Sequence, residues 1–392
     1  MEDHPAGPAC PEPRGLPSLS VVVPVRDGGD AFRRCLRALR ETTGADFELI
    51  VVDDASRDDS AAIAEDAGAV VVHHDRPLGP AAARNHGARA ASAPIVFFLD
   101  ADVAVSPDAP ARVLARFAAD PGLAALFGSY DAEPTAPGLV SRFRNLLHHY
   151  THQVGPFRDD ARPAHTFWTG CGAIRRDVFL ALGGFDPQLY RRPAIEDIEF
   201  GYRLTRAGHR IELVRTLQVT HLKRWTLGEV VRTDIFRRGV PWTVLMLRSK
   251  VAESDLNVSA SQRASVAATA LTGLGGLLAP IEPKALSLLA IGPASVVLLN
   301  AGFYRFLARR LGPIGAAASL PLHLLYFCCC GLSVAIGLGL YLAQRRCRQP
   351  IADRQPLRPR PDTAGATAPG PHSLPSPCPG SRREWSRIET LP

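Results

Sequence analysis

The chain has 392 residues, of which 46% are hydrophobic and 21% charged, so it is long enough for two to three domains and is neither disordered nor fibrous as a whole. The formal net charge is +7, but five of these seven charges lie in residues 345–392. Without a basic stripe interleaved with aromatic residues, a nucleic-acid partner is not expected. The eight cysteines lack the paired spacing of a disulfide framework or a zinc site, which favours a reducing compartment.

Composition divides the chain into four parts. Residues 1–18 are rich in proline and acidic residues, have no apolar core that would indicate a signal peptide, and are predicted to be disordered. Residues 19–250 alternate strand-like with helix-like stretches, and residues 264–344 are almost uncharged. Residues 345–392 are rich in Pro, Arg and Ser and are predicted to form a disordered tail.

Four continuous apolar runs of strand length begin the second part, at residues 19–25, 47–52, 69–73 and 95–99. Such runs are typical of strands buried on both faces, as in a parallel sheet. Because helical patterns lie between them, they indicate βαβ units. The predicted fold class is therefore α/β, with a doubly wound, mostly parallel sheet whose ligands bind at the carboxyl ends of the strands.

Acidic residues stand at these strand ends. Asp54 follows the second run, and Asp100 and Asp102 follow the fourth. Carboxylates two residues apart just past a strand can turn toward one pocket, and oxygen ligands of this kind suit Mg²⁺ or Mn²⁺. The Asp-x-Asp pair thus predicts a metal and phosphate site. The alternative is a solvated acidic turn.

Later stretches add three candidate features, each with a structural alternative. Arg84, in a helical stretch of small residues, could meet a diphosphate through charge-assisted hydrogen bonds, or could be a solvated arginine on a helix packed closely against the sheet. Gly170 and Gly172 would let the backbone approach a ligand. Glu196 and Asp197 fall in the first turn of a predicted helix, where the dipole keeps a carboxylate ionised and able to act as a general base. Plain N-terminal charge preference explains such acids equally.

Three apolar segments, residues 264–281, 285–300 and 311–344, predict two to three transmembrane helices, because a span needs about 20 apolar residues. The last segment qualifies clearly. The first is short and Gly-rich and the second contains Pro293, so either could instead be a buried or re-entrant helix. Arginines flank the last segment on both sides, which leaves the number of spans open.

Six short motifs are spread over residues 19–225. They are SVVVPVRD (20–27), VVDDASRD (51–58), GPAAARNHGA (79–88), FFLDAD (97–102), GGFDP (183–187) and EDIEFGYRLTRAGHRI (196–211). In this order they resemble the motifs of family 2 glycosyltransferases, whose catalytic domain has the GT-A fold. The resemblance implies a nucleotide sugar as donor and a divalent ion, Mn²⁺ or Mg²⁺, as cofactor.

The resemblance also implies roles for single residues. Asp102 would bind the metal, and Asp197 would be the catalytic base. His221 is a second candidate ligand, and the equal alternative is a histidine that simply ends a strand. The nucleotide site would be formed by Pro24, Val25, Asp54, Arg84 and Asp100. The residues expected on the sugar or acceptor side are Trp168, Gly170, Gly172, Glu196 and Trp225.

The implied activity is metal-dependent, inverting transfer of one sugar, of hexosyltransferase type, to a hydroxyl of a lipid or membrane-proximal glycan acceptor. The expected location is the cell membrane, with several spans and a cytoplasmic catalytic domain. Processive polysaccharide synthases of the family carry Gln-x-x-Arg-Trp, whereas this chain has His221 in place of the Gln, so processive synthesis is kept as an alternative. A sugar-phosphate nucleotidyltransferase is a second alternative to single-sugar transfer, and a non-enzymatic membrane scaffold is the last.

Overall fold

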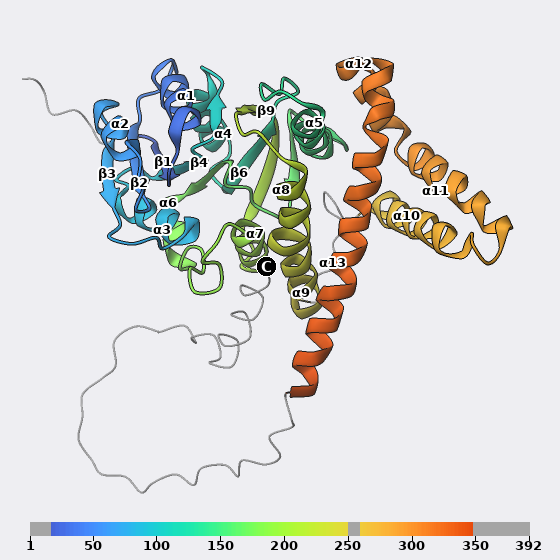
Figure 1. The fold of residues 1–392 in the computed structure, drawn as a ribbon. Coiled ribbons are helices and arrows are strands. Elements are labelled where there is room, and N and C mark those ends of the chain that lie inside the picture. The colour runs from blue at the N-terminus through green and yellow to red at the C-terminus, as the bar shows by residue number, and fades with distance from the viewer. Residues whose placement is uncertain (1–16, 250–258, 348–392) are drawn as a thin grey trace, which may run out of the picture.

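The computed structural model describes residues 17–249 and 259–347 (Figure 1). Almost all of the predicted disordered N-terminus, residues 1–18, and of the predicted tail, residues 345–392, lies outside the described residues. Within the described ranges the chain forms an α/β domain followed by a group of C-terminal helices (Figure 1).

A nine-stranded sheet forms the centre of the α/β domain. The strands are β1 (Ser20–Val25), β2 (Glu48–Asp53), β3 (Val70–His73), β4 (Ile95–Leu99), β5 (Val103–Val105), β6 (Leu123–Tyr130), β7 (Ala161–Ala164), β8 (Cys171–Arg175) and β9 (Arg210–His221). Their order across the sheet is β3-β2-β1-β4-β8-β6-β9-β5, and β7 also pairs with β9. The four predicted strands are β1 to β4, with ends that differ by one residue at most.

The strands run mostly in one direction. The adjacent strands β3, β2, β1 and β4 are mutually parallel, and β6 is parallel to β9. β8 is antiparallel to both β4 and β6, and β5 and β7 are antiparallel to β9. The predicted α/β sheet is therefore confirmed. What the apolar runs did not indicate is β8, which enters the sheet in the opposite direction beside β4.

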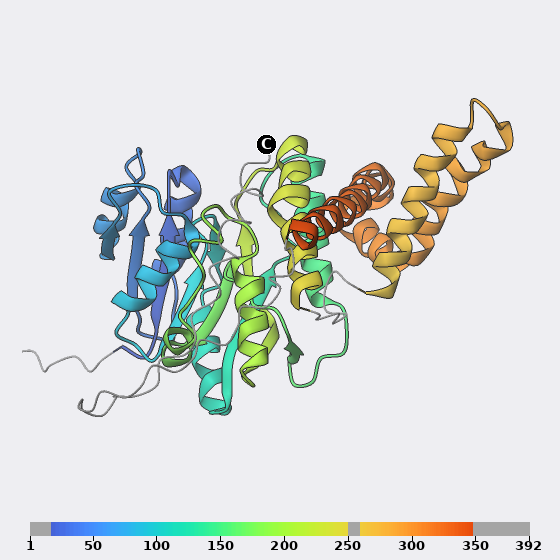
Figure 2. The same ribbon diagram turned by 90° about the horizontal axis from the view of Figure 1, so that it is seen from below.

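Helices cover both faces of the sheet (Figure 2). α1 (Gly29–Arg40), α2 (Ser60–Asp66) and α4 (Ala109–Ala119) pack on one face, and α3 (Pro80–Ala90), α6 (Arg176–Ala181) and α7 (Glu196–Arg206) pack on the other. Successive side chains of a strand point to opposite faces, so the β1 residues Val21 and Val22 enter different cores.

The small residues of α3 let this helix approach the sheet closely. A Cβ atom on Gly87 would lie 2.3 Å from Cγ1 of Val22, which leaves no room for a side chain. The predicted close packing of this helix is thus confirmed. It matters for the site because it holds Arg84, on the same helix, over the strand ends.

The C-terminal part is helical throughout its described residues. α5 (Leu139–Gln153) precedes it and packs against it. Its segments are α8 (Leu227–Arg232), the π-helical η1 (Thr233–Gly239), α9 (Val240–Ser249), α10 (Ala260–Leu278), the short η3 (Pro283–Ala285), α11 (Leu286–Leu299), α12 (Ala301–Ala318) and α13 (Leu320–Cys347). α13 runs alongside α9, whereas α10 and α11 extend away from the sheet (Figures 1 and 2).

One described helix, Leu320–Gln344 within α13, is long and apolar enough to cross a membrane. The bent pair Pro283–Leu299 and Ala301–Ala318, with 81° between its halves, counts as a second candidate if it is one broken span. The predicted segment 264–281, most of which lies in α10, does not meet the same measure of length and apolarity. The described residues therefore offer one or two candidate spans, where the sequence predicts two to three.

Large apolar side chains are exposed along these helices. Monomeric soluble proteins rarely expose contiguous apolar patches of this extent, which mark membrane or protein contacts. They include Leu271, Leu274, Leu277, Ile281, Leu286, Leu289, Ile291, Leu298, Ile314, Leu332, Val334, Leu338 and Leu342.

Glycines let α13 dock closely on η1 and α9. A Cβ atom on Gly337 would lie 2.7 Å from Cβ of Thr243, and one on Gly239 would lie 2.2 Å from Oγ of Ser333. Gly339, on the same helix, has no atom within 4 Å of such a Cβ. We expect Gly337→Val to destabilise the protein by about 1–3 kcal/mol through overpacking. Gly339→Val is the matched control and should stay within about 0.5 kcal/mol of the wild type.

Thermal unfolding of the full chain in a non-ionic detergent tests this docking. The Gly337→Val protein should unfold at a lower temperature than the Gly339→Val protein, because the two share the same change in helix propensity. Equal unfolding temperatures would mean that α13 does not rest on α9.

Candidate active site

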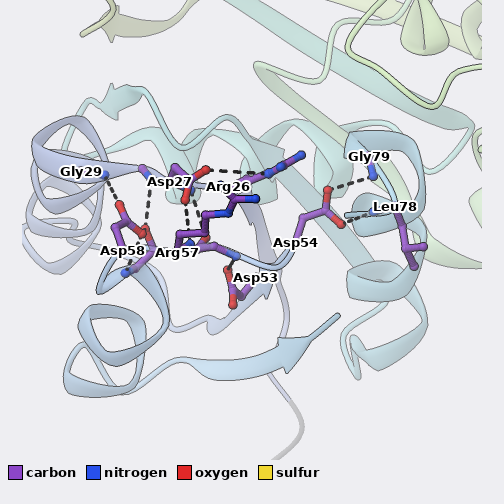
Figure 3. A network of polar contacts seen from close by, with 12 residues as sticks. Arg26, Asp27, Gly29, Asp53, Asp54, Arg57, Asp58, Leu78 and Gly79 are labelled. Atoms are coloured by element: carbon purple, nitrogen blue, oxygen red, sulfur yellow. Dashed lines mark hydrogen bonds and ion pairs between the residues drawn. The ribbon is translucent and has the colours of Figure 1, made fainter. Parts of the chain in front are cut away.

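Asp54, at the carboxyl end of β2, is held by the loop that leads into α3 (Figure 3). Its Oδ1 accepts hydrogen bonds from the backbone N–H of Leu78 at 2.7 Å and its Oδ2 from that of Gly79 at 2.8 Å. Nδ1 of His74 lies 2.7 Å from Oδ1. Both carboxylate oxygens are therefore occupied from within the chain. In this structure Asp54 fixes the loop, and the predicted contact with a base stays a prediction.

Gly79 is required at this position for two reasons. Its φ of +90° favours glycine, and a Cβ there would lie 2.0 Å from the carbonyl oxygen of Arg191. The loop before α3 is thus clamped between Asp54 and the segment that precedes α7. Pro24 and Val25 end the neighbouring strand β1, and the Val25 carbonyl accepts a hydrogen bond from the Asp54 N–H at 2.8 Å, so these three predicted nucleotide-site residues do lie together.

Arg84 links two predicted parts of the site that are far apart in the sequence. Its Nη2 donates to Oδ1 of Asp100, just after β4, at 2.6 Å, and its Nη1 donates to Oε1 of Glu196, at the start of α7, at 2.9 Å. Burial would lower the pKa of Arg84, but the carboxylates of Asp100 and Glu196 outweigh it and raise that pKa above its usual value. The arginine is therefore charged and buried, and the alternative of a solvated side chain is wrong.

Both carboxylate oxygens of Glu196 accept hydrogen bonds from within the chain. Besides Arg84, it accepts a hydrogen bond from the N–H of Ala194 at 2.9 Å, and its residue is only 4% exposed. The predicted contact of Glu196 with the sugar or acceptor stays a prediction. Its charge balances Arg84, because a buried ion needs a partner of opposite charge.

Asp197 follows directly and faces a different neighbour. Its Oδ2 accepts hydrogen bonds from the N–H of Thr169 at 3.2 Å and from the Thr169 hydroxyl at 3.3 Å. Burial and the adjacent Glu196 carboxylate raise the pKa of Asp197 to about 6, against the opposing charge of Arg84. The position of Asp197 in the first turn of α7 is as predicted, but its pKa is raised rather than lowered. Desolvation governs it, and gives a pKa close to that of an effective general base at neutral pH.

Asp102, just before β5, and His221, the last residue of β9, lie close together. The antiparallel register pairs Val103 with His221, which brings Asp102 Oδ2 within 3.7 Å of His221 Nε2. Burial would raise the pKa of Asp102, but His221 and then Lys223 outweigh it and hold that pKa below its usual range. An ionised carboxylate beside an imidazole is a donor pair that Mn²⁺ accepts.

The described residues contain no group of three or more His, Cys, Asp or Glu side chains that could hold a metal ion. The Asp102 and His221 pair still fits an ion that the substrate completes, because Mg²⁺ and similar ions at phosphate-transfer sites are bound by one or two protein ligands together with substrate phosphates and water. Asp100 accepts a hydrogen bond from Arg84 through its Oδ1.

Aromatic rings lie between Asp102 with its neighbour His221 and the stretch that bonds to Asp197. Tyr130, at the end of β6, stacks on His221 with 4.2 Å between ring centroids and meets Trp168 edge-on at 4.9 Å. A Cβ on Gly170 would lie 2.3 Å from the Trp168 ring, and one on Gly172 would lie 2.3 Å from the Trp168 carbonyl oxygen. The sequence predicts that these glycines admit a ligand. In this structure they make room for Trp168.

Trp225 lies at the same end of the sheet, 6.3 Å from the His221 ring. The Lys223 ammonium sits over its indole at 4.2 Å, a cation–π contact that fixes the ring plane. Tyr130 is a site residue that the motifs did not indicate. It ends an apolar run and could have been found as another strand-end residue.

The α/β domain matches a known protein family. Residues 20–183 match the family model Glycosyl transferase family 2. The Pre-mycofactocin glycosyltransferase of Mycobacterium tuberculosis is 29% identical over 242 residues, which cover 60% of this chain and 48% of that protein. The Validoxylamine A glucosyltransferase of Streptomyces hygroscopicus subsp. jinggangensis is 34% identical over 222 residues, which cover 49% of this chain and 52% of that protein.

The chain thus spans about half the length of the curated relatives it matches. A solved structure that resembles this chain is the mannosyltransferase PcManGT from Pyrobaculum calidifontis in complex with GDP-Man and Mn²⁺. The match covers 85% of this chain and 89% of that chain, with 17% sequence identity and a TM-score of 0.46. At that TM-score the likeness does not bear on the site.

Proposed function

Since residues 20–183 match the family model Glycosyl transferase family 2, we propose that this protein transfers a single sugar from a nucleoside diphosphate sugar to an acceptor hydroxyl, with inversion at the anomeric carbon. The observation that carries the proposal is the bridge made by Arg84. It holds Asp100, at the end of β4, and Glu196, next to Asp197, at one edge of the sheet. This bridge supports the proposal that Asp100 and the predicted base Asp197 belong to one site.

In the proposed reaction, the acceptor hydroxyl gives its proton to a carboxylate oxygen of Asp197. The acceptor oxygen then attacks the anomeric carbon, and the bond from that carbon to the diphosphate oxygen breaks with its electron pair on the leaving nucleoside diphosphate. Attack opposite the leaving group inverts the configuration. With a pKa of about 6, Asp197 is mostly ionised at pH 7 and remains basic enough to accept a proton.

We propose that Asp102 and His221 hold the divalent ion, which would stabilise the charge that develops on the leaving diphosphate. Asp102→Asn should raise the Mn²⁺ concentration for half-maximal activity by roughly tenfold or more, as a titration of turnover against Mn²⁺ will show. Asp108→Asn removes a carboxylate that pairs only with surface groups and serves as the control. An unchanged Mn²⁺ requirement in Asp102→Asn would remove this residue from the metal site.

The proposed acceptor is a lipid or another membrane-proximal hydroxyl compound. The exposed apolar side chains of α10 to α13 support attachment of the catalytic domain to a membrane. A cytoplasmic orientation at the cell membrane is part of the proposal, because nucleotide sugars are normally available on that side.

A panel of nucleotide sugars tests the function. The full chain is incubated with each donor and Mn²⁺, with and without a native lipid extract, and the released nucleotide is identified. Release of a nucleoside diphosphate that depends on the extract is the expected result. Release of pyrophosphate would indicate a nucleotidyltransferase instead, and growth of a long polymer would indicate processive synthesis.

A further inference from the structure

A cavity of about 320 Å³ lies between the α/β domain and the helices α10 and α13. Its walls come from the end of β6, from α5, from the helix formed by α8, η1 and α9, and from α10 and α13. Cavities of this volume are of the size that binds small molecules. None of the motifs in the sequence points to it.

One side of the cavity is apolar. Val266 of α10 and Phe327 and Val334 of α13 line it, together with Leu147 of α5. Val334 is also 52% exposed, and the apolar side chains of Leu338 and Leu342 farther along α13 are exposed as well. The apolar wall is therefore continuous with the surface that we propose to meet the membrane.

The other side of the cavity presents polar groups without partners. Nδ1 of His148 and Nε1 of Trp225 are buried, and neither has a hydrogen-bond partner among the described residues. Buried polar atoms are nearly always paired with protein or water, so these two atoms beside the cavity are candidates to pair with a bound molecule. Trp225 in particular can only donate.

The cavity also carries unbalanced positive charge. Arg144 is neutralised by Asp234, to which it donates at 2.9 Å. Arg238 and Arg263 line the same cavity and are exposed to solvent, and neither has an ion-pair or hydrogen-bond partner in residues 17–249 and 259–347. Arg238 lies in η1, and such π-helical segments frequently occur at functional sites. A ligand with a negative group would balance these two cations.

The cavity adjoins the catalytic centre. Tyr130 and Trp225 line it, and both rings approach His221. His148 also lines it and lies 4.8 Å from Trp168, whose neighbour Thr169 bonds to Asp197. The Arg238 charge is close enough to lower the pKa of Asp197. One layer of side chains thus separates the cavity from the predicted base and metal ligands.

We infer that this cavity binds the acceptor of the proposed reaction, and that the acceptor is an anionic amphiphile. Its negative group lies at Arg238 and Arg263, and its apolar chain lies between α10 and α13 toward the exposed apolar surface. That the bound molecule is the acceptor rests on the proposed function. The binding chemistry itself, one negative group joined to an apolar chain, follows from the cavity walls alone.

Isothermal titration of the full chain in a non-ionic detergent tests this inference with octyl phosphate as the probe. Inorganic phosphate lacks the chain and octyltrimethylammonium reverses the charge, and both should bind roughly tenfold more weakly or worse. Arg238→Gln should weaken octyl phosphate binding by roughly tenfold or more, since it removes a charge-assisted contact. Val266→Trp, which fills the apolar side, should abolish it.

Two matched variants control for general damage. Arg237→Gln removes the neighbouring charge of η1, and Leu271→Trp adds the same bulk to an exposed position of α10. Both should bind octyl phosphate like the wild type. Equal binding by all four variants, or preference for the cationic probe, would overturn the inference.

Binding of nucleoside diphosphates with Mn²⁺ is measured on the same samples. A protein that binds a nucleoside diphosphate but not octyl phosphate keeps the proposed function and loses this inference. A protein that binds octyl phosphate through Arg238 and Val266 but binds no nucleotide keeps the cavity assignment and loses the proposed function.

Discussion

Asp197→Asn is expected to lower kcat by about 10²–10⁴-fold, the usual contribution of a general base. The amide is nearly isosteric and can still accept the hydrogen bonds from Thr169, so the fold and the nucleotide affinity should stay near the wild-type values. Single-turnover rates give the chemical step, and titration with the nucleoside diphosphate gives the affinity. Turnover that is retained in this variant would remove Asp197 from the reaction.

The same residue fixes the pH dependence. The base must be ionised to accept a proton, and burial together with Glu196 raises its pKa to about 6. The ratio kcat/KM should therefore be constant above that value and fall about tenfold for each pH unit below it. Glu196→Gln removes the neighbouring negative charge, so the acid limb should move to lower pH. If kcat/KM of Glu196→Gln falls at the same pH as in the wild type, another group controls the acid limb.

Arg84→Met is expected to cost about 3–5 kcal/mol of folding free energy, because it leaves the buried Glu196 carboxylate without a counter-charge. It should also move the acid limb of the pH profile upward, since the arginine charge opposes the rise in the Asp197 pKa. Denaturant unfolding gives the first effect and the pH dependence of kcat/KM gives the second.

The double variant Arg84→Met/Glu196→Gln separates pairing from simple loss of volume. If the bridge is the reason for the instability, neutralising Glu196 should restore most of the lost free energy, because no unpaired charge then remains next to α7. Arg84→Lys keeps the charge but cannot donate to two carboxylates through a planar fork, so it should be intermediate. A double variant less stable than Arg84→Met alone would show that the pair is not coupled in this way.

Local patterns in the amino-acid sequence were enough to identify the strands β1 to β4 and the acids that follow them. A buried parallel strand shows as a continuous apolar run, and the residue after the run is at the carboxyl edge whatever the remainder of the chain does. The small residues of α3 likewise indicated its close packing, because such residues let a helix approach a sheet. The motif order indicated the family without any knowledge of contacts.

The contacts of the site residues, in contrast, depend on how distant segments pack. Arg84 and Glu196 are 112 residues apart, and no spacing rule pairs them. The raised pKa of Asp197 comes from desolvation, which depends on everything packed around the carboxylate, whereas the sequence shows only its place in a helix. Likewise Gly170 and Gly172 serve Trp168, and the cavity exists because α13 returns to the domain more than a hundred residues after β6. The sequence pattern therefore predicts the secondary-structure position of a site residue. Its side-chain contacts and its pKa depend on the tertiary packing around it.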